Sequence, residues 1–234
     1  MRELLEEIGL SGRTRTDRPY VVVNFVASAD GHAAYRGRSR WLSDEADREL
    51  FHGLREHVDA ILMGTGTLRT ERYGRLVRDP ERRQRRAASG LAPDPLACIF
   101  SRSGDIPTDI PLFGDPSSRI AVFTAAHLDT AGLGAQVELV RLDPGELTLT
   151  TMMRRLRSDY DVRSLLCEGG PTLFGALLQE GLADELFLSL SPKLTGGGNA
   201  PAITSGPELA DLRELELISA LELESSLFLR YALR

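Results

Sequence analysis

The segment from residue 165 to residue 173 constrains the fold of this chain more than any other. An apolar run is followed by Glu168, two glycines and Pro171, and a second apolar run begins there. Glycines let backbone N–H groups approach a ligand, a helix N-terminus favours an anion, and proline suits the first helical position. A carboxylate at a strand end points toward the crevice where open α/β sheets bind ligands. The pattern predicts a buried strand, a tight turn and a helix, and the turn is either a phosphate and substrate site or a plain connection.

Length and composition favour an ordinary α/β protein. The 234 residues suit one domain or two small ones, and 42% hydrophobic with 26% charged residues gives ample material for a core. No apolar run approaches the roughly 20 residues that a membrane helix needs, and the N-terminus lacks an apolar signal-peptide core. A net charge of −6 argues against general nucleic-acid binding. We therefore expect a cytoplasmic protein that binds neither membranes nor nucleic acids.

The cysteines and histidines do not form a metal-binding pattern. Cys98 and Cys167 each lie inside an apolar run, so we expect buried, reduced thiols and no disulfide. The four histidines show no ligand spacing with them, and are His32, His52, His57 and His127. No metal site is predicted.

Strand patterns alternate with helix patterns along most of the chain, which predicts a largely parallel sheet. Strands are expected at residues 19–28, 59–63, 95–100, 119–124, 135–140, 164–167 and 184–191, and helices at 43–57, 125–132, 148–158 and 171–180. The last two apolar runs, 212–222 and 225–234, predict an antiparallel pair at the sheet edge. Residues 73–95 are polar and arginine-rich, and are expected to form a long irregular loop. We expect an N-terminal helical extension over 1–18 and a single domain over 19–234.

Several glycine-containing turns follow the predicted strands. They lie at residues 28–31, 64–67 and 168–170, and a further glycine-rich loop spans 192–198. Turns at the ends of parallel strands can converge on one crevice. The dinucleotide pattern G-x-G-x-x-G after the first strand and the P-loop pattern are both absent, as is the zinc deaminase pattern. An ordinary Rossmann domain is therefore not expected.

Six segments, in the same order along the chain, resemble the reductase domain of riboflavin biosynthesis. They are residues 23–31, 37–41, 54–55, 59–67, 168–173 and 191–198. The resemblance implies a dihydrofolate-reductase-like α/β fold, with a central, mostly parallel mixed sheet, flanking helices and an antiparallel C-terminal strand pair. It also implies NADPH-dependent reduction of a phosphorylated ribosylamino-pyrimidine, of the 5-amino-6-(5-phosphoribosylamino)uracil type, to its ribitylamino form. The chain resembles a stand-alone form of this reductase, and relatives of this kind are homodimers.

The same resemblance implies roles for individual residues. Positions beside the cofactor are Trp41, Gly64, Gly66, Thr67, Glu71, Gly169, Gly170, Pro171, Thr172 and Leu173. Substrate-side positions are Ser39, Arg55, Arg78 and Glu168. Arginines suit a phosphorylated sugar because the guanidinium group binds phosphate with two parallel hydrogen bonds.

Simpler interpretations exist for some of these residues. Trp41 is also consistent with a core aromatic and Arg55 with a surface helix arginine. Glu168 and Asp30 are the strand-end carboxylates that could act as proton donor, and Asp30 also suits a purely structural role before Gly31.

One segment departs from the family pattern. The family usually carries Asp-Asp-Pro after the glycine–threonine turn, whereas this chain has Glu71, Arg72, Tyr73 and Gly74. Because the segment faces the substrate in the resemblance, two alternatives stay open. One is an NADPH-dependent reductase of a pteridine- or dihydrofolate-like compound, and the other is a non-catalytic nucleotide-binding protein.

Overall fold

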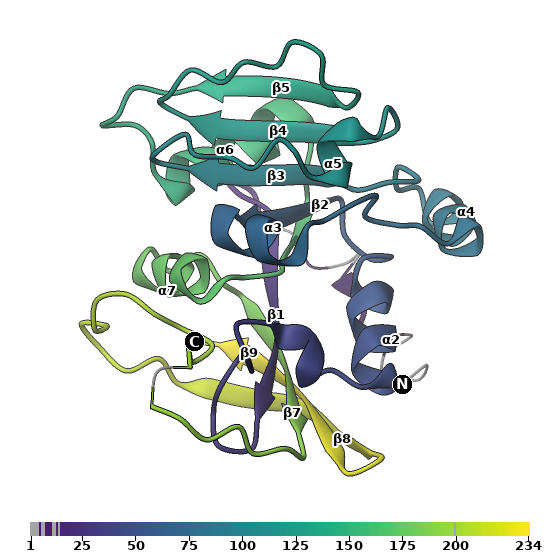
Figure 1. Ribbon diagram of the computed structural model, residues 1–234, viewed down its shortest axis with the longest axis vertical. Helices are drawn as coiled ribbons and strands as arrows, with labels where there is room; N and C mark the ends of the chain where they lie inside the picture. Colours follow the sequence, from purple (N-terminus) through teal and green to yellow (C-terminus); the bar gives the residue numbers. More distant parts are fainter. Residues whose placement is uncertain (1–4, 6–7, 11–12, 14, 199) are drawn as a thin grey trace.

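A nine-stranded sheet runs through the whole molecule, with helices on both faces (Figure 1). The structure is a computed structural model that describes all residues except 1–4, 6–7, 11–12, 14 and 199. The strands are β1 (Tyr20–Ser28), β2 (Ala60–Gly64), β3 (Leu96–Ser101), β4 (Arg119–Thr124), β5 (Gln136–Arg141), β6 (Ser164–Cys167), β7 (Glu185–Ser191), β8 (Leu215–Leu223) and β9 (Ser226–Leu233). The helices are α2 (Glu45–Leu54), α3 (Thr65–Glu71), α4 (Pro80–Ala88), α5 (Pro111–Gly114), α6 (Leu149–Tyr160) and α7 (Pro171–Gln179), with a 3₁₀ turn at Ser39–Trp41.

The strand order is β5-β4-β3-β2-β6-β1-β7-β9-β8. All neighbours from β5 to β7 pair in parallel, whereas β9 pairs antiparallel with both β7 and β8. The predicted parallel sheet with an antiparallel C-terminal pair at its edge is therefore confirmed. The order places β1, β6 and β2 at the centre, where consecutive apolar residues are buried by helices on both sides.

Two apolar cores, one on each face, hold the helices to the sheet. Val21 and Val23 of β1 point into the core with α6 and α7, and Val22 between them points into the core with α2 and α3. Ile8 and Leu10 pack into this second core, so the N-terminal segment covers the α2 side. Half of the residues in the predicted helical extension over 1–18 lie outside the described part of the chain.

The structure corrects three local predictions. Residues 73–95 contain the helix α4, and the predicted turn at 64–67 is the direct junction of β2 with α3, which begins at Thr65. No helix forms at 125–132, and the short helix α5 lies before β4. The sequence does contain a helix-start pattern for α4. Asp79 caps the helix by accepting a hydrogen bond from the amide of Glu81, and Pro80 occupies the first turn.

Contacts with the segment that follows α2 explain why α4 forms without an apolar stripe. The guanidinium of Arg85 pairs with Glu56 at 2.7 Å, and Arg82 pairs with the same carboxylate. Arg86 is fully buried and donates to the carbonyl oxygens of Val58 and Ala92. Tertiary ion pairs and hydrogen bonds thus replace the periodic apolar pattern on which the helix prediction depends.

Both cysteines are buried free thiols, as predicted. Burial raises the pKa of Cys167 to about 12, so the thiol stays protonated at neutral pH. In the described part of the chain, no group of three or more histidine, cysteine or acidic residues is arranged to hold a metal ion. Nor is any helix within the described ranges both long and apolar enough to cross a membrane.

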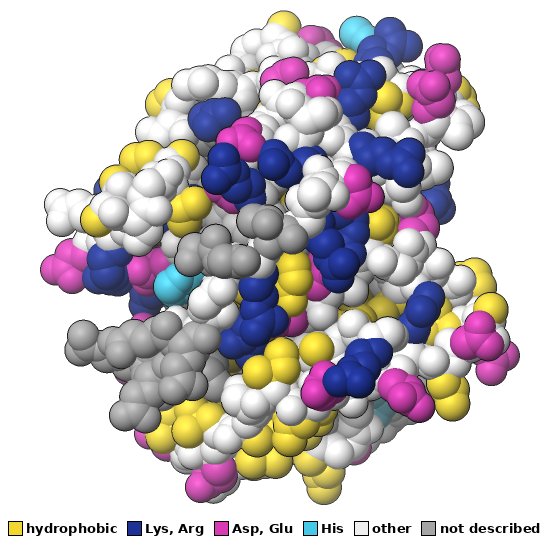
Figure 2. Space-filling view, turned by 180° about the vertical axis from the view of Figure 1, so that it is seen from behind, with side chains coloured by type: hydrophobic (Ala, Val, Ile, Leu, Met, Phe, Trp, Pro, Cys, Tyr) yellow, Lys and Arg dark blue, Asp and Glu magenta, His cyan; other side chains and the backbone are white. Residues whose placement is uncertain are grey.

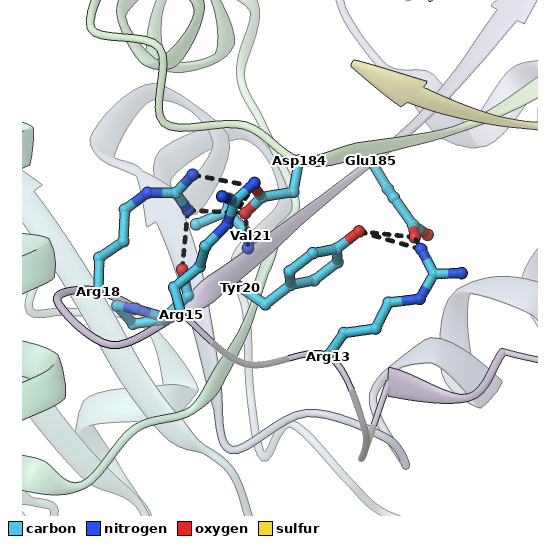
Figure 3. A network of polar contacts seen from close by, with 8 residues as sticks. Arg13, Arg15, Arg18, Tyr20, Val21, Asp184 and Glu185 are labelled. Atoms are coloured by element: carbon cyan, nitrogen blue, oxygen red, sulfur yellow. Dashed lines mark hydrogen bonds and ion pairs between the residues drawn. The ribbon is translucent and has the colours of Figure 1, made fainter. Parts of the chain in front are cut away.

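Arginines before β1 are tied to two acidic residues at the start of β7 (Figure 3). Asp184 accepts from Arg18 at 2.6 Å, from Arg15 at 2.7 Å and from the backbone amide of Val21 at 2.8 Å. Glu185 beside it binds Tyr20, Arg13 and Arg230. Figure 2 shows the same interspersion of basic and acidic side chains over the back of the molecule.

We predict that Asp184→Ala lowers the free energy of unfolding by about 3–5 kcal/mol, because it leaves the half-buried Arg18 and the Val21 amide unpaired. The matched control is Asp159→Ala, which removes an exposed pair with Arg155 and costs less than about 1 kcal/mol. Urea unfolding followed by circular dichroism measures both changes. Equal losses in the two variants would contradict the prediction.

Candidate active site

One large cavity, of about 1110 Å³, lies at the carboxyl ends of the central strands. It is lined from β1, the α2 face, the starts of α3 and α7, and the segment between α3 and α4. Most predicted site residues meet there: Ser39, Arg55, Gly64, Gly66, Thr67, Glu71, Arg78, Glu168, Gly170, Pro171, Thr172 and Leu173. This is the place where parallel α/β sheets bind ligands, because the strand ends diverge into helices on opposite faces.

Two helix N-termini lie side by side at the cavity wall. The amide of Gly64 donates to the carbonyl oxygen of Gly169 at 2.9 Å, so the turn before α3 touches the turn before α7. Gly169 has a φ of +87°, which favours glycine, and a Cβ atom there would come within 3.1 Å of the Phe25 ring. A Cβ atom on Gly170 would meet Thr67 Oγ1 at 3.1 Å. A side chain at either position would therefore make a tight contact with its neighbour.

These helix starts fit a phosphate-bearing cofactor. The residues preceding α3 and α7 are Gly64 and Gly170, neither of which has a side chain to cap the helix. First-turn N–H groups therefore remain available to an anion, and α7 adds a helix dipole whose positive end faces the cavity. Thr67 and Thr172 supply hydroxyls beside them. The arrangement suits the pyrophosphate of a dinucleotide.

Glu168 and Arg55 form a buried ion pair at the cavity wall. Arg55 Nε lies 2.6 Å from Glu168 Oε1, and Arg55 Nη2 lies 2.7 Å from Oε2, a two-pronged geometry that fixes both groups. The third nitrogen of Arg55 donates to the Leu76 carbonyl oxygen at 2.6 Å. Both oxygens of Glu168 accept from the guanidinium, so the carboxylate is held in a fixed orientation at the cavity wall.

Two aromatic rings hold the guanidinium of Arg55 in place. It lies 4.2 Å from the centre of the Phe51 ring and 5.5 Å from that of Tyr73. Burial and the neighbouring Glu168 raise the pKa of Tyr73 well above its ordinary value, so this hydroxyl stays neutral. Tyr73 therefore packs against the ion pair of Arg55 and Glu168. It belongs to the segment that departs from the family pattern.

Other predicted substrate positions lie around this pair. Ser39 Oγ donates to Glu71 Oε1 at 3.3 Å, which joins a predicted substrate residue to a predicted cofactor residue. Arg78 is exposed at the rim, with its guanidinium beside Gly74. Two arginines were expected to face a phosphate, and of these Arg78 is exposed to a ligand. Arg55 is buried and bound to Glu168, so it is not a surface arginine, and its guanidinium is already occupied by a carboxylate.

The structure also corrects two predictions. Asp30 does not line the cavity, and its carboxylate accepts hydrogen bonds from Ser28 and from the amides of Gly196 and Thr195. The bonds from Ser28 and Gly196 hold the pKa of Asp30 well below its usual range, so the group is ionised and cannot act as the proton donor. It fixes the 192–198 loop instead.

The second correction concerns Trp41, which is not a core aromatic. Its side chain is 49% exposed, beside the guanidinium of Arg40, and it does not line the cavity. Lys193 donates to the carbonyl oxygens of Trp41 and Leu42, so the 192–198 loop holds this turn. Gly169 likewise lies behind the cavity lining, where its carbonyl oxygen binds Gly64.

The cavity lining also includes residues that the sequence analysis did not assign to the site, among them Asn24, Asp47, Phe51 and Tyr73. A polar residue within the apolar β1 run was the available signal for Asn24. Phe51 and Asp47 lie four and eight residues before Arg55, the residue that caps the end of α2, and this spacing places all three on one face.

Comparison with known proteins identifies the family to which this fold and site belong. The model of the RibD C-terminal domain family matches residues 19–229, and the chain belongs to this family. The 2,5-diamino-6-ribosylamino-4(3H)-pyrimidinone 5′-phosphate reductase of Archaeoglobus fulgidus is 28% identical over 203 residues, which are 86% of this chain and 93% of that protein. The riboflavin biosynthesis protein RibD of Mycobacterium tuberculosis is 33% identical over 187 residues, 79% of this chain and 45% of that protein. The solved structure of Acinetobacter baumannii RibD has a TM-score of 0.76 and 26% identity, and the match covers 94% of this chain and 59% of that one.

We predict that Arg55→Ala lowers the free energy of unfolding by about 3–5 kcal/mol, because it leaves Glu168 buried without its cation. In the double variant with Glu168→Ala no unpaired charge remains, so the combined loss should fall short of the sum by more than about 1 kcal/mol. Denaturant unfolding of the four proteins measures this coupling. The exposed pair of Arg69 and Asp105 is the control and should show coupling below about 1 kcal/mol. Additive losses at Arg55 and Glu168 would contradict the prediction.

Proposed function

We propose that this protein reduces a phosphorylated ribosylamino-pyrimidine to its ribitylamino form, with NADPH as the reductant. The observation that carries the proposal is the meeting, in one cavity, of two uncapped helix starts with the ion pair of Glu168 and Arg55. The first element suits the phosphates of a dinucleotide, and the second offers a fixed carboxylate to a polar substrate. Family membership supports the same activity.

The chain's own residues would bind and orient the two ligands. The first turns of α3 and α7 would hold the cofactor phosphates, with Thr67 and Thr172 beside them. A reduced nicotinamide supplies a hydride, and the acceptor is the sugar C1′ of the ring-opened imine. Glu168, held in place by Arg55, would accept hydrogen bonds from the substrate and favour its protonated imine electrostatically. The exposed guanidinium of Arg78 would receive the substrate phosphate.

The specificity for NADPH over NADH is part of this proposal. Arg102, at the end of β3, lines the cavity on the side where α3 begins, and its guanidinium stacks against Phe100. An arginine at this place offers a cation to the additional phosphate of NADPH.

The test is the loss of nicotinamide absorbance when NADPH, the protein and candidate substrates are combined. We expect turnover with a phosphoribosylamino-pyrimidine and none with dihydrofolate, and Glu168→Gln should lower kcat/KM by roughly 100-fold because the fixed negative charge is lost. Glu214→Gln, an exposed change of the same kind, should leave kcat/KM unaltered. Full activity of Glu168→Gln would contradict the assignment of Glu168 to the active site.

Two other outcomes would favour the alternatives. Reduction of dihydrofolate in preference to the pyrimidines would identify a pteridine-type reductase, which the altered segment from Glu71 to Gly74 makes worth testing. NADPH binding without turnover of any candidate would indicate a non-catalytic nucleotide-binding protein.

We further propose that the protein is a homodimer that pairs through the β8–β9 edge. Leu217 of β8 is 53% exposed and Leu227 of β9 is 40% exposed. Leu221 and Leu223, also in β8, pack partly against the core. Exposed apolar side chains on edge strands are typical of protein interfaces. Light scattering should give a dimer mass for the native protein and a monomer mass for Leu217→Lys, and a native monomer would refute the assignment.

A further inference from the structure

The segment between α3 and α4 carries Arg78, the arginine that would receive the substrate phosphate. Residues 72–79 are all described, and none of them belongs to a helix or a strand. Arg78 is exposed at the cavity rim and forms no ion pair with any described residue. A phosphate can therefore reach its guanidinium, but no regular secondary structure fixes the backbone from which this side chain extends.

Three consecutive carbonyl oxygens of this segment accept hydrogen bonds from two arginines. The oxygen of Leu76 accepts from Arg55 Nη1 at 2.6 Å. The oxygens of Val77 and Arg78 both accept from Arg83 Nη1, at 2.9 Å and 2.7 Å. Hydrogen bonds from a cation are stronger than those between neutral groups, so these bonds replace the missing secondary structure in holding the backbone of Arg78.

Both arginines are themselves held in place. Arg55 stands at the end of α2 and is bound to Glu168 at the cavity wall. Arg83 stands in α4, which is tied to the end of α2 by Arg86, a fully buried residue that donates to the carbonyl oxygens of Arg55 and Val58. The segment that carries Arg78 is therefore connected on both sides to the ion pair at the centre of the site.

We propose that Arg83 is a positioning residue of the reductase reaction, which fixes the backbone of Arg78 so that its guanidinium is ready for the substrate phosphate. The inference rests on the proposed function and adds to it a residue that does not line the cavity. A binding group whose backbone is already ordered loses less conformational entropy when the ligand arrives. Arg83 thus acts on substrate binding through Arg78.

A purely structural role for Arg83 in α4 would have a different consequence. Loss of the helix would disturb the whole cavity rim and lower activity toward every substrate alike. Other arginines of α4 keep the helix in place without Arg83, since Arg82 pairs with Glu49 at 2.7 Å and Arg85 pairs with Glu56 at 2.7 Å. Dependence of the effect on the substrate phosphate therefore separates the two roles.

The experiment compares kcat/KM, measured by NADPH oxidation, for the phosphoribosylamino-pyrimidine and for the same compound without its phosphate. In the wild-type protein the phosphate should raise kcat/KM by roughly 100-fold, the contribution of a hydrogen-bonded pair of charges. Arg83→Ala should lower kcat/KM for the phosphorylated compound by roughly 10-fold and leave the value for the other compound unchanged. Arg83→Lys should restore part of the loss, because an ammonium group still donates to a carbonyl oxygen.

Two comparisons make the test specific. In a protein that already carries Arg78→Ala, the further change Arg83→Ala should have no effect on either compound, because the group that it positions is absent. The matched control is Arg85→Ala, which removes an exposed guanidinium two positions further along α4 and should keep the wild-type ratio. Circular dichroism and the KM for NADPH check the fold of each variant, and Arg83→Lys provides the same comparison if Arg83→Ala does not fold.

An equal loss for both compounds in the Arg83 variants would overturn the inference and leave the proposed function intact. A full effect of Arg83→Ala in the absence of the Arg78 guanidinium would also overturn it. Absence of turnover of either compound by the wild-type protein would refute the proposed function itself, and the assignment of Arg83 with it.

Discussion

The buried pairing of Glu168 with Arg55 is the interaction on which the site depends. It joins the turn after β6 to the end of α2, two elements that are 113 residues apart in the sequence. Because both oxygens of the carboxylate and three nitrogens of the guanidinium are engaged, neither group can turn without losing a hydrogen bond. The face of α2 that carries Asp47 and Phe51 is thereby held at a fixed distance from the central strands.

The cavity combines two different kinds of electrostatic environment. On one side, the starts of α3 and α7 present backbone N–H groups, which favour an anion. On the other, Glu168 and Asp47 present carboxylates, which favour donors and positive charge. A site with this division suits a phosphate-rich cofactor on one side and a nitrogen-rich heterocycle on the other. Tyr73 and Phe51 pack against the guanidinium of Arg55, whose pair with Glu168 is buried.

Local sequence patterns were sufficient where burial dictates the residue type. The apolar runs of β1, β2 and β6 are buried on both faces, so their positions were predicted closely. The glycines of the turn at 168–170 were also identified, because a helix start that touches another backbone excludes a Cβ atom. The helix α4 was missed since its stability comes from ion pairs with Glu56 and from carbonyl oxygens that bind Arg86. Such partners are distant in sequence and leave no periodic pattern.

The sequence by itself determined the sheet, its antiparallel edge and the glycine turn beside Glu168, because these features follow from apolar periodicity and backbone freedom. Only the tertiary structure decided how the charged groups are paired. In the folded chain Arg55 pairs with Glu168, and Asp30 binds the 192–198 loop. Asp47 faces the cavity, and its Oδ1 has no hydrogen-bond partner among the described residues. The physical reason is that a charged side chain has the same residue type whether it pairs with a neighbour or awaits a ligand, and the difference lies in which partners the fold brings within hydrogen-bond distance.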